Sequence, residues 1–168
     1  MRAASSSLME FMSTTFNLEK GKIWEAPSRD WENGEGVEGY VPKTIVRDHV
    51  LPIQEHRDIL MSLPKSQRKI VILKRDVEDS FLSQLNRNGE CHYKSRTDNR
   101  DECHKAFKKF REDIEIMFPE EDGFLHIEYE DLINNQDREI KKILDYYELS
   151  YDKEKAYELP HIRGWDWG

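Results

Sequence analysis

The sequence has 168 residues, the length of one compact domain, of which 37% are hydrophobic and 36% charged. This composition excludes an intrinsically disordered chain, and the formal net charge of −8 argues against a general affinity for nucleic acid or anionic membranes. No apolar stretch reaches the length of a membrane span or signal peptide. The 2 cysteines make no disulfide framework, so we expect reduced thiols and a cytoplasmic protein.

The first half of the chain predicts a helix, a loop, a strand and a second helix. Apolar residues at helical spacing indicate a helix over residues 5–18. Residues 19–42 are rich in glycine, proline and charge and are expected to form a loop. A short strand follows at residues 44–46, and the next helix is predicted to end at Pro64.

The second half predicts further strands alternating with helices. Residues 69–74 are an aliphatic run between basic residues, as expected for a strand covered on both faces. The next expected elements are a helix from Val77, a polar loop over 86–100, a helix with an apolar stripe from Cys103 to Met117, a strand over 124–127 and a helix over 140–147. This alternation predicts one α/β domain over residues 1–168, with a central parallel sheet in a three-layer α/β/α arrangement.

The segment from Lys74 to Ser83 places polar residues where a strand ends and a helix begins. Ligands of parallel α/β folds bind beyond the carboxyl ends of strands, so Arg75 is expected at the ligand edge. The segment resembles the sulfotransferase motif R-D-P-R-D-V-x-x-S, with Val77 at the position of the proline. The resemblance implies that Arg75 and Ser83 hold the 3′-phosphate of 3′-phosphoadenosine 5′-phosphosulfate (PAPS). The alternative is an ordinary strand-to-helix junction with a surface arginine.

The segment from Ile45 to Pro52 resembles the family motif K-T-H-L-P, whose histidine is the general base. An imidazole suits this task because its unperturbed pKa of about 6.5 lies near neutrality. The resemblance therefore implies that His49 is the base and that Arg47 stands where the family has lysine. The alternative is a surface or packed histidine.

The first residues resemble the family's 5′-phosphosulfate loop, P-[KR]-S-G-[ST]-[ST]-x-L. The resemblance implies that Arg2 faces the sulfuryl and 5′-phosphate oxygens. It also implies a binding loop made of Arg2, Ala3, Ala4, Ser5, Ser6 and Ser7. Ala4 replaces a glycine, and no hydrophobic strand precedes the loop in the sequence, so activity requires a strand from upstream or from another chain. The alternative is a serine-rich helix cap.

Two later segments extend the resemblance. Residues 124–132 are similar to a structural strand that ends in Y-E-D-L, and the tail over 160–168 resembles the R-K-G-x-x-G-D-W loop that closes over the nucleotide. The second likeness implies that Arg163 and Gly164 contact the 3′-phosphate, whereas the alternative is a frayed terminus. The segments occur in the family's order, which implies the P-loop NTPase-like sulfotransferase fold.

The resemblance implies an enzyme that transfers a sulfuryl group from PAPS to a hydroxyl or amine of a small molecule or glycan. Such an enzyme releases 3′-phosphoadenosine 5′-phosphate (PAP) and needs no metal. The resemblance assigns catalysis to His49, Arg2 and Arg47. A homodimer is compatible with the sequence. The alternative function is a catalytically degenerate homologue that binds a nucleotide or a protein.

Two other site types remain open. Cys91-His92 and Cys103-His104 repeat a pair of metal ligands, although adjacent residues rarely bind one tetrahedral zinc and Cys103 fits the helix stripe. The second is a nucleoside-triphosphate enzyme, but the sequence does not contain the phosphate-binding motif G-x-x-x-x-G-K-[ST]. A basic cluster, interpreted as a solvated helix face that could attract an acidic acceptor, comprises Lys105, Lys108, Lys109 and Arg111.

Overall fold

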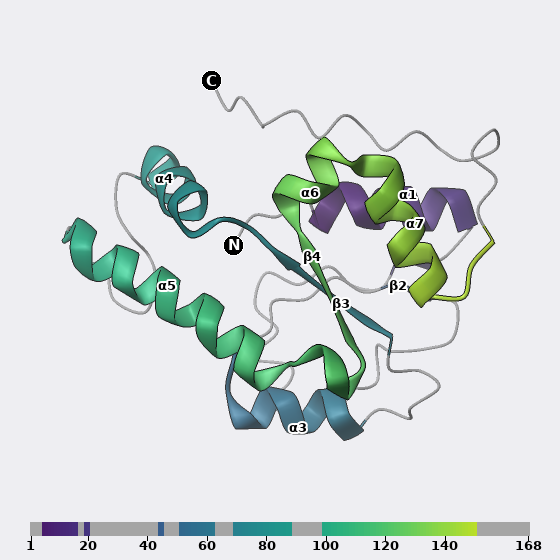
Figure 1. The fold of residues 1–168 in the computed structure, drawn as a ribbon, viewed down its shortest axis with the longest axis horizontal. Helices are drawn as coiled ribbons and strands as arrows, with labels where there is room; N and C mark the ends of the chain where they lie inside the picture. Colours follow the sequence, from purple (N-terminus) through teal and green to yellow (C-terminus); the bar gives the residue numbers. More distant parts are fainter. Residues whose placement is uncertain are drawn as a thin grey trace.

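The computed structural model describes residues 5–16, 19–20, 44–45, 51–62, 69–88 and 99–150 (Figure 1). Its elements in chain order are α1 (Ser5–Phe16), β1 (Glu19–Lys20), β2 (Thr44–Ile45), α3 (Gln54–Ser62), β3 (Ile70–Lys74), α4 (Val77–Asn88), α5 (Arg100–Met117), a 3-10 helix (Glu120–Asp122), β4 (Phe124–Glu128), α6 (Tyr129–Asn134) and α7 (Gln136–Tyr146). The expected alternation of helices and strands is confirmed for the described ranges.

The strands pair in parallel, as the alternating pattern predicts. β3 lies beside β4 with Ile70 opposite Phe124 and Lys74 opposite Glu128, and β1 pairs with β2. The described strands form two separate pairs and not one continuous sheet. The chain therefore has a mixed α/β fold with a small parallel sheet.

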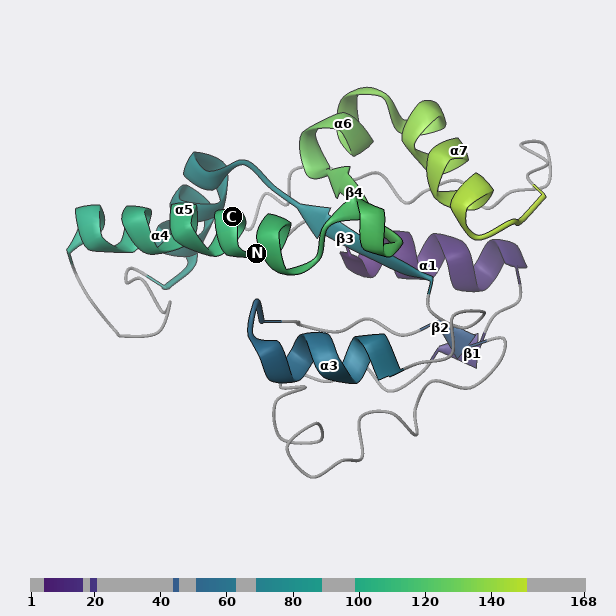
Figure 2. The same cartoon turned by 60° about the horizontal axis from the view of Figure 1, so that its bottom comes forward.

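Helices cover both faces of the β3–β4 pair (Figure 2). Successive strand side chains point to opposite faces, so the odd and even residues of β3 enter different clusters. Val71 and Leu73 pack with α1, α6 and α7 in a cluster formed by Leu8, Phe11, Met12, Ile127, Leu132, Ile140, Ile143 and Leu144. Ile70 and Ile72 pack with α3 and α5 in a second cluster formed by Leu60, Ile114, Phe118 and Phe124. The aliphatic run is thus a strand covered on both faces, as expected.

The apolar stripe of α5 follows the predicted spacing. Cys103, Phe107 and Ile114 are buried along it. The helix begins where the side chain of Asn99 accepts hydrogen bonds from the backbone N–H groups of Asp101 and Glu102. The stripe therefore fixes which face of α5 meets the rest of the molecule.

Three boundaries differ from expectation. α4 continues to Asn88, within the predicted loop over 86–100, because polar residues have only a modest preference against the helix and do not by themselves end one. Glu19–Lys20 is a strand although it begins the predicted loop over 19–42. The Y-E-D-L segment is the short helix α6, in which Tyr129 and Leu132 are buried at a spacing that places them on one face.

The expectation of reduced thiols is wrong for this structure. Cys103 is disulfide-bonded, and the other cysteine of the sequence, Cys91, lies outside the described residues. Cysteine content therefore no longer supports a reducing compartment. Within the described ranges, no helix combines the length and apolarity needed to cross a membrane.

Candidate functional site

The candidate site lies where β3 and β4 both end. Lys74 and Glu128 are partners in the parallel register and are the last residues of their strands. Only Arg75 and Asp76 separate β3 from α4. The carboxyl end of the sheet and the start of a helix therefore meet at one place, which is where parallel α/β folds bind ligands.

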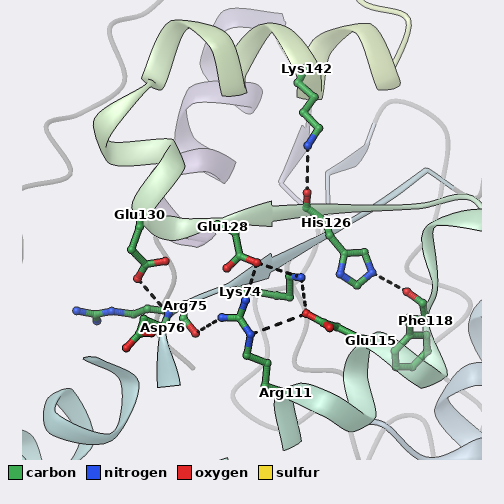
Figure 3. A network of polar contacts seen from close by, with 10 residues as sticks. All are labelled: Lys74, Arg75, Asp76, Arg111, Glu115, Phe118, His126, Glu128, Glu130 and Lys142. Carbon is green, nitrogen blue, oxygen red and sulfur yellow. Dashed lines mark hydrogen bonds and ion pairs between the residues drawn. The ribbon is translucent and has the colours of Figure 1, made fainter. Parts of the chain in front are cut away.

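An ion-pair network joins α5 to the two strand ends (Figure 3). The Lys74 ammonium is 2.8 Å from Glu115 Oε1 and 3.1 Å from Glu128 Oε1. Arg111 reaches the same Glu128 oxygen at 2.6 Å. Lys74 is only 8% exposed, so these carboxylates replace the water that its charge gives up on burial. The hydrogen bond from Lys74 lowers the pKa of Glu115.

Arg75 extends away from this network because neighbouring residues of an extended segment point to opposite faces (Figure 3). Its guanidinium lies 4.7 Å from the centre of the Tyr129 ring, at the start of α6. Its backbone carbonyl accepts a hydrogen bond of 2.9 Å from Arg111 Nη1 on the other side. A half-buried cation is thus held at the end of β3 by contacts from α5 and α6.

A carboxylate caps the N-terminus of α4. Asp76 Oδ1 accepts from the backbone N–H of Glu78 at 2.8 Å and of Asp79 at 3.1 Å. The N–H of Asp76 donates in turn to Glu130 Oε1 at 3.0 Å. Because these amides already have an anionic partner, a phosphate at this junction would depend on the Arg75 side chain more than on the helix N-terminus.

Two serines of α4 follow this junction. Ser83, the residue that the motif selects, is half-buried. Ser80 lies one turn closer to the strand and is 4% exposed, and its hydroxyl has no hydrogen-bond partner within the described part of the chain. Ser80 could not be singled out from the sequence, because nothing in it marks a serine whose hydroxyl is buried without a partner in the described part of the chain.

Most of the other predicted site residues lie outside the described ranges. They are Arg2, Ala3, Ala4, Arg47, His49, Arg163 and Gly164. Ser5 and Ser6 belong to α1, but their side chains are not described, whereas Ser7 is a half-buried residue of that helix. The structure therefore locates Arg75 and Ser83 on one strand-to-helix unit, and the remaining assignments stay predictions.

Arg111 was not predicted from the sequence as a residue of this site. Interpreting it as part of a solvated helix face is wrong, although Lys105, Lys108 and Lys109 are exposed as expected. A signal was available, because Arg111 lies four residues after Phe107 and three before Ile114, in phase with the buried stripe. A charged residue in a buried stripe needs a partner, and Glu128 provides it.

Two further features contain none of the residues that the sequence predicted for donor binding or catalysis. Cys103 is in a disulfide and His104 Nε2 lies 2.9 Å from Glu78, so neither supports the zinc interpretation, and no metal-binding group occurs among the described residues. An open hollow of about 570 Å³ between β4 and α7 is lined by none of the predicted site residues. Its lining is His126, Glu128, Asp131, Arg138, Glu139, Lys141, Lys142 and Asp145.

Comparison with known proteins matches residues 52–153 to the model described as the sulfotransferase family. The matched range contains β3, α4, α5 and β4, and hence both strand ends and the Arg75 junction. No curated protein and no solved structure matches the chain.

Proposed function

Because the chain belongs to the sulfotransferase family, we propose that it transfers a sulfuryl group from PAPS to a hydroxyl or amine of a small molecule or glycan. Arg75 and Ser83 bind the 3′-phosphate of the donor in this proposal. Arg2 and the serine-rich start of α1 bind its 5′-phosphosulfate, and Arg163 with Gly164 closes over the nucleotide. The fold that fits this function is the three-layer, P-loop NTPase-like sulfotransferase fold.

The position of Arg75 carries the proposal. A fixed guanidinium at the carboxyl end of a parallel strand offers a phosphate a bidentate, charge-assisted partner. The stack on Tyr129 at 4.7 Å and the Arg111 contact to the Arg75 carbonyl restrict this residue before any ligand arrives. Such restriction reduces the conformational entropy lost when the phosphate binds.

His49 takes the acceptor proton in the proposed reaction. The acceptor oxygen or nitrogen forms a bond to sulfur while the bond between sulfur and the 5′-phosphate oxygen breaks. The displaced electron pair stays on the 5′-phosphate, which leaves as part of PAP, and the imidazole keeps the proton. Arg2 and Arg47 face the oxygens on which negative charge grows, as group transfer of this kind requires.

Calorimetric titration tests the donor assignment. The protein should bind PAP more tightly than 5′-AMP, which lacks the 3′-phosphate, and more tightly than ATP. Replacing Arg75 by alanine should weaken PAP binding about 10- to 100-fold and leave the affinity for 5′-AMP nearly unchanged, because a charge-assisted contact is lost. Equal affinity of the wild-type chain for PAP and 5′-AMP would overturn the proposal.

A second experiment separates catalysis from binding. His49→Ala should lower sulfuryl transfer from labelled PAPS to a panel of hydroxyl and amine acceptors about 100-fold or more, while PAP affinity stays near that of the wild type. Turnover near the wild-type rate would remove His49 from the mechanism. A wild-type chain that binds PAP and transfers no label to any acceptor would favour the degenerate, nucleotide-binding alternative.

A further inference from the structure

Arg111 contacts both strand ends from a helix that the sequence motif does not include. Its Nη1 donates to the carbonyl of Arg75 at 2.9 Å, and its Nη2 donates to Glu128 Oε1 at 2.6 Å. One planar group on α5 thus fixes the backbone just after β3 and the side chain at the end of β4. We propose that Arg111 is a positioning residue that sets the direction of the Arg75 guanidinium toward the donor's 3′-phosphate, an inference that rests on the proposed function.

The position of the Arg75 carbonyl explains why this contact matters. β3 ends at Lys74, so the carbonyl of Arg75 lies beyond the strand pairing, and Arg111 takes the place of a strand partner. The backbone at residue 75 determines where its side chain starts, and the Tyr129 ring lies against the far end of that side chain. Arg111 therefore holds the base of the Arg75 side chain while Tyr129 contacts its tip.

The surrounding charges fix Arg111 itself. Glu128 Oε1 also lies 3.1 Å from the buried Lys74 ammonium, which in turn lies 2.8 Å from Glu115. Arg111 Nε is 3.9 Å from the same Glu115 oxygen, one helical turn along α5. Two cations and two carboxylates alternate in this cluster, so the guanidinium is held on more than one side. A lysine in its place would keep the charge and lose the planar fork that spans the two contacts.

The experiment measures the affinities for PAP and 5′-AMP by calorimetry in Arg111→Gln, Arg75→Ala and the double variant. Arg111→Gln should weaken PAP binding about 3- to 10-fold, change 5′-AMP binding less than about 2-fold, and have no further effect once Arg75 is alanine. Arg111→Lys should give an intermediate loss. Lys109→Gln is the matched control, because it removes an exposed cation of the same helix that pairs with Asp113 four residues along the chain.

Several outcomes would overturn the inference. These are equal losses for both ligands, the same loss of PAP affinity with and without Arg75, or wild-type affinity in a folded Arg111→Gln protein. If Arg111→Gln does not fold, the PAP and 5′-AMP affinities of Arg111→Lys are measured instead, once with Arg75 present and once with alanine at that position. A wild-type chain that does not distinguish PAP from 5′-AMP overturns the proposed function and this inference with it, whereas normal discrimination with additive losses overturns the role of Arg111 alone.

Discussion

The buried ammonium of Lys74 shows how single residues specify the geometry of the strand ends. It gives up water and is surrounded by the carboxylates of Glu115 and Glu128, the second of which it shares with Arg111. Burying ions costs much of the free energy that their attraction returns, so such a cluster contributes more to the arrangement of groups than to net stability. The cluster thus explains a defined position for Arg75 better than it explains a stable fold.

The lowered pKa of Glu115 makes part of the folding free energy depend on pH. Its main cause is the hydrogen bond from Lys74, and the ordinary value is 4.5. A carboxyl with a depressed folded-state pKa stabilises the protein fully above its unfolded pKa, and this contribution is lost as the pH falls through the folded value. The stability advantage of the wild type over Glu115→Gln should therefore shrink on acidification below 4.5, as measured by urea unfolding.

The Lys74→Met background provides the control for this titration. With the hydrogen-bond donor removed, the pH dependence of the Glu115→Gln difference should become smaller in the same range. A pH-dependent difference of unchanged size in that background would contradict the assignment to Lys74.

The lone hydroxyl of Ser80 gives a prediction about stability. Its burial without a partner in the described structure costs desolvation free energy that alanine does not incur. Ser13 is also buried in a helix, but its hydroxyl donates to the carbonyl of Glu10 at 3.2 Å. Ser80→Ala should therefore raise the free energy of unfolding by about 1 kcal/mol relative to Ser13→Ala, since both changes gain the same helix propensity. Equal effects in chemical denaturation would contradict this account.

At the scale of elements, α5 combines packing with positioning. Its buried stripe contacts the sheet and α3, and Arg111, in phase with that stripe, reaches the strand ends. Periodicity alone predicted the helix and its apolar face, because regular spacing is a local property. It did not predict that Arg111 would find Glu128, since that pairing depends on where β4 ends in space.

A matched pair of isoleucines tests the orientation of α5. Ile114 is 6% exposed and Ile116 is 77% exposed, two residues apart on the same helix. Ile114→Ala should lower the free energy of unfolding by about 2–5 kcal/mol, because it removes buried methyl groups and leaves a cavity. Ile116→Ala should change it by less than about 0.5 kcal/mol. Urea denaturation of both variants checks the prediction, and similar losses would mean that the helix face is wrongly oriented.

At the scale of the whole molecule, the disulfide revises the chemical setting of the protein. Cys103 is 1% exposed and lies with Phe81 and Phe107 in the cluster that joins α4 to α5. A covalent link at this position restrains the unfolded chain. The disulfide therefore removes the cysteine-based argument for a reducing environment that the sequence suggested.

Reduction of the protein tests this link. A reductant should lower the free energy of unfolding by about 2–4 kcal/mol in the wild type, as measured by denaturation with and without the reductant. A Cys91→Ser variant should be insensitive to the reductant and as stable as the reduced wild type. Unchanged stability after thiol titration has shown complete reduction would exclude a stabilising disulfide.

The sequence by itself determined the features that depend on residues close together in the chain, namely the helices, the strands and the motif spacing. Aliphatic runs, helix stripes and the Arg75-to-Ser83 spacing predicted the elements and the family, because each depends on residues close together in the chain. Tertiary structure alone decided that Lys74, Arg111 and Glu128 meet, that Tyr129 lies against Arg75, and that Cys103 is oxidised. These contacts join segments that are distant in sequence, and folding brings them together through packing on both faces of the β3–β4 pair.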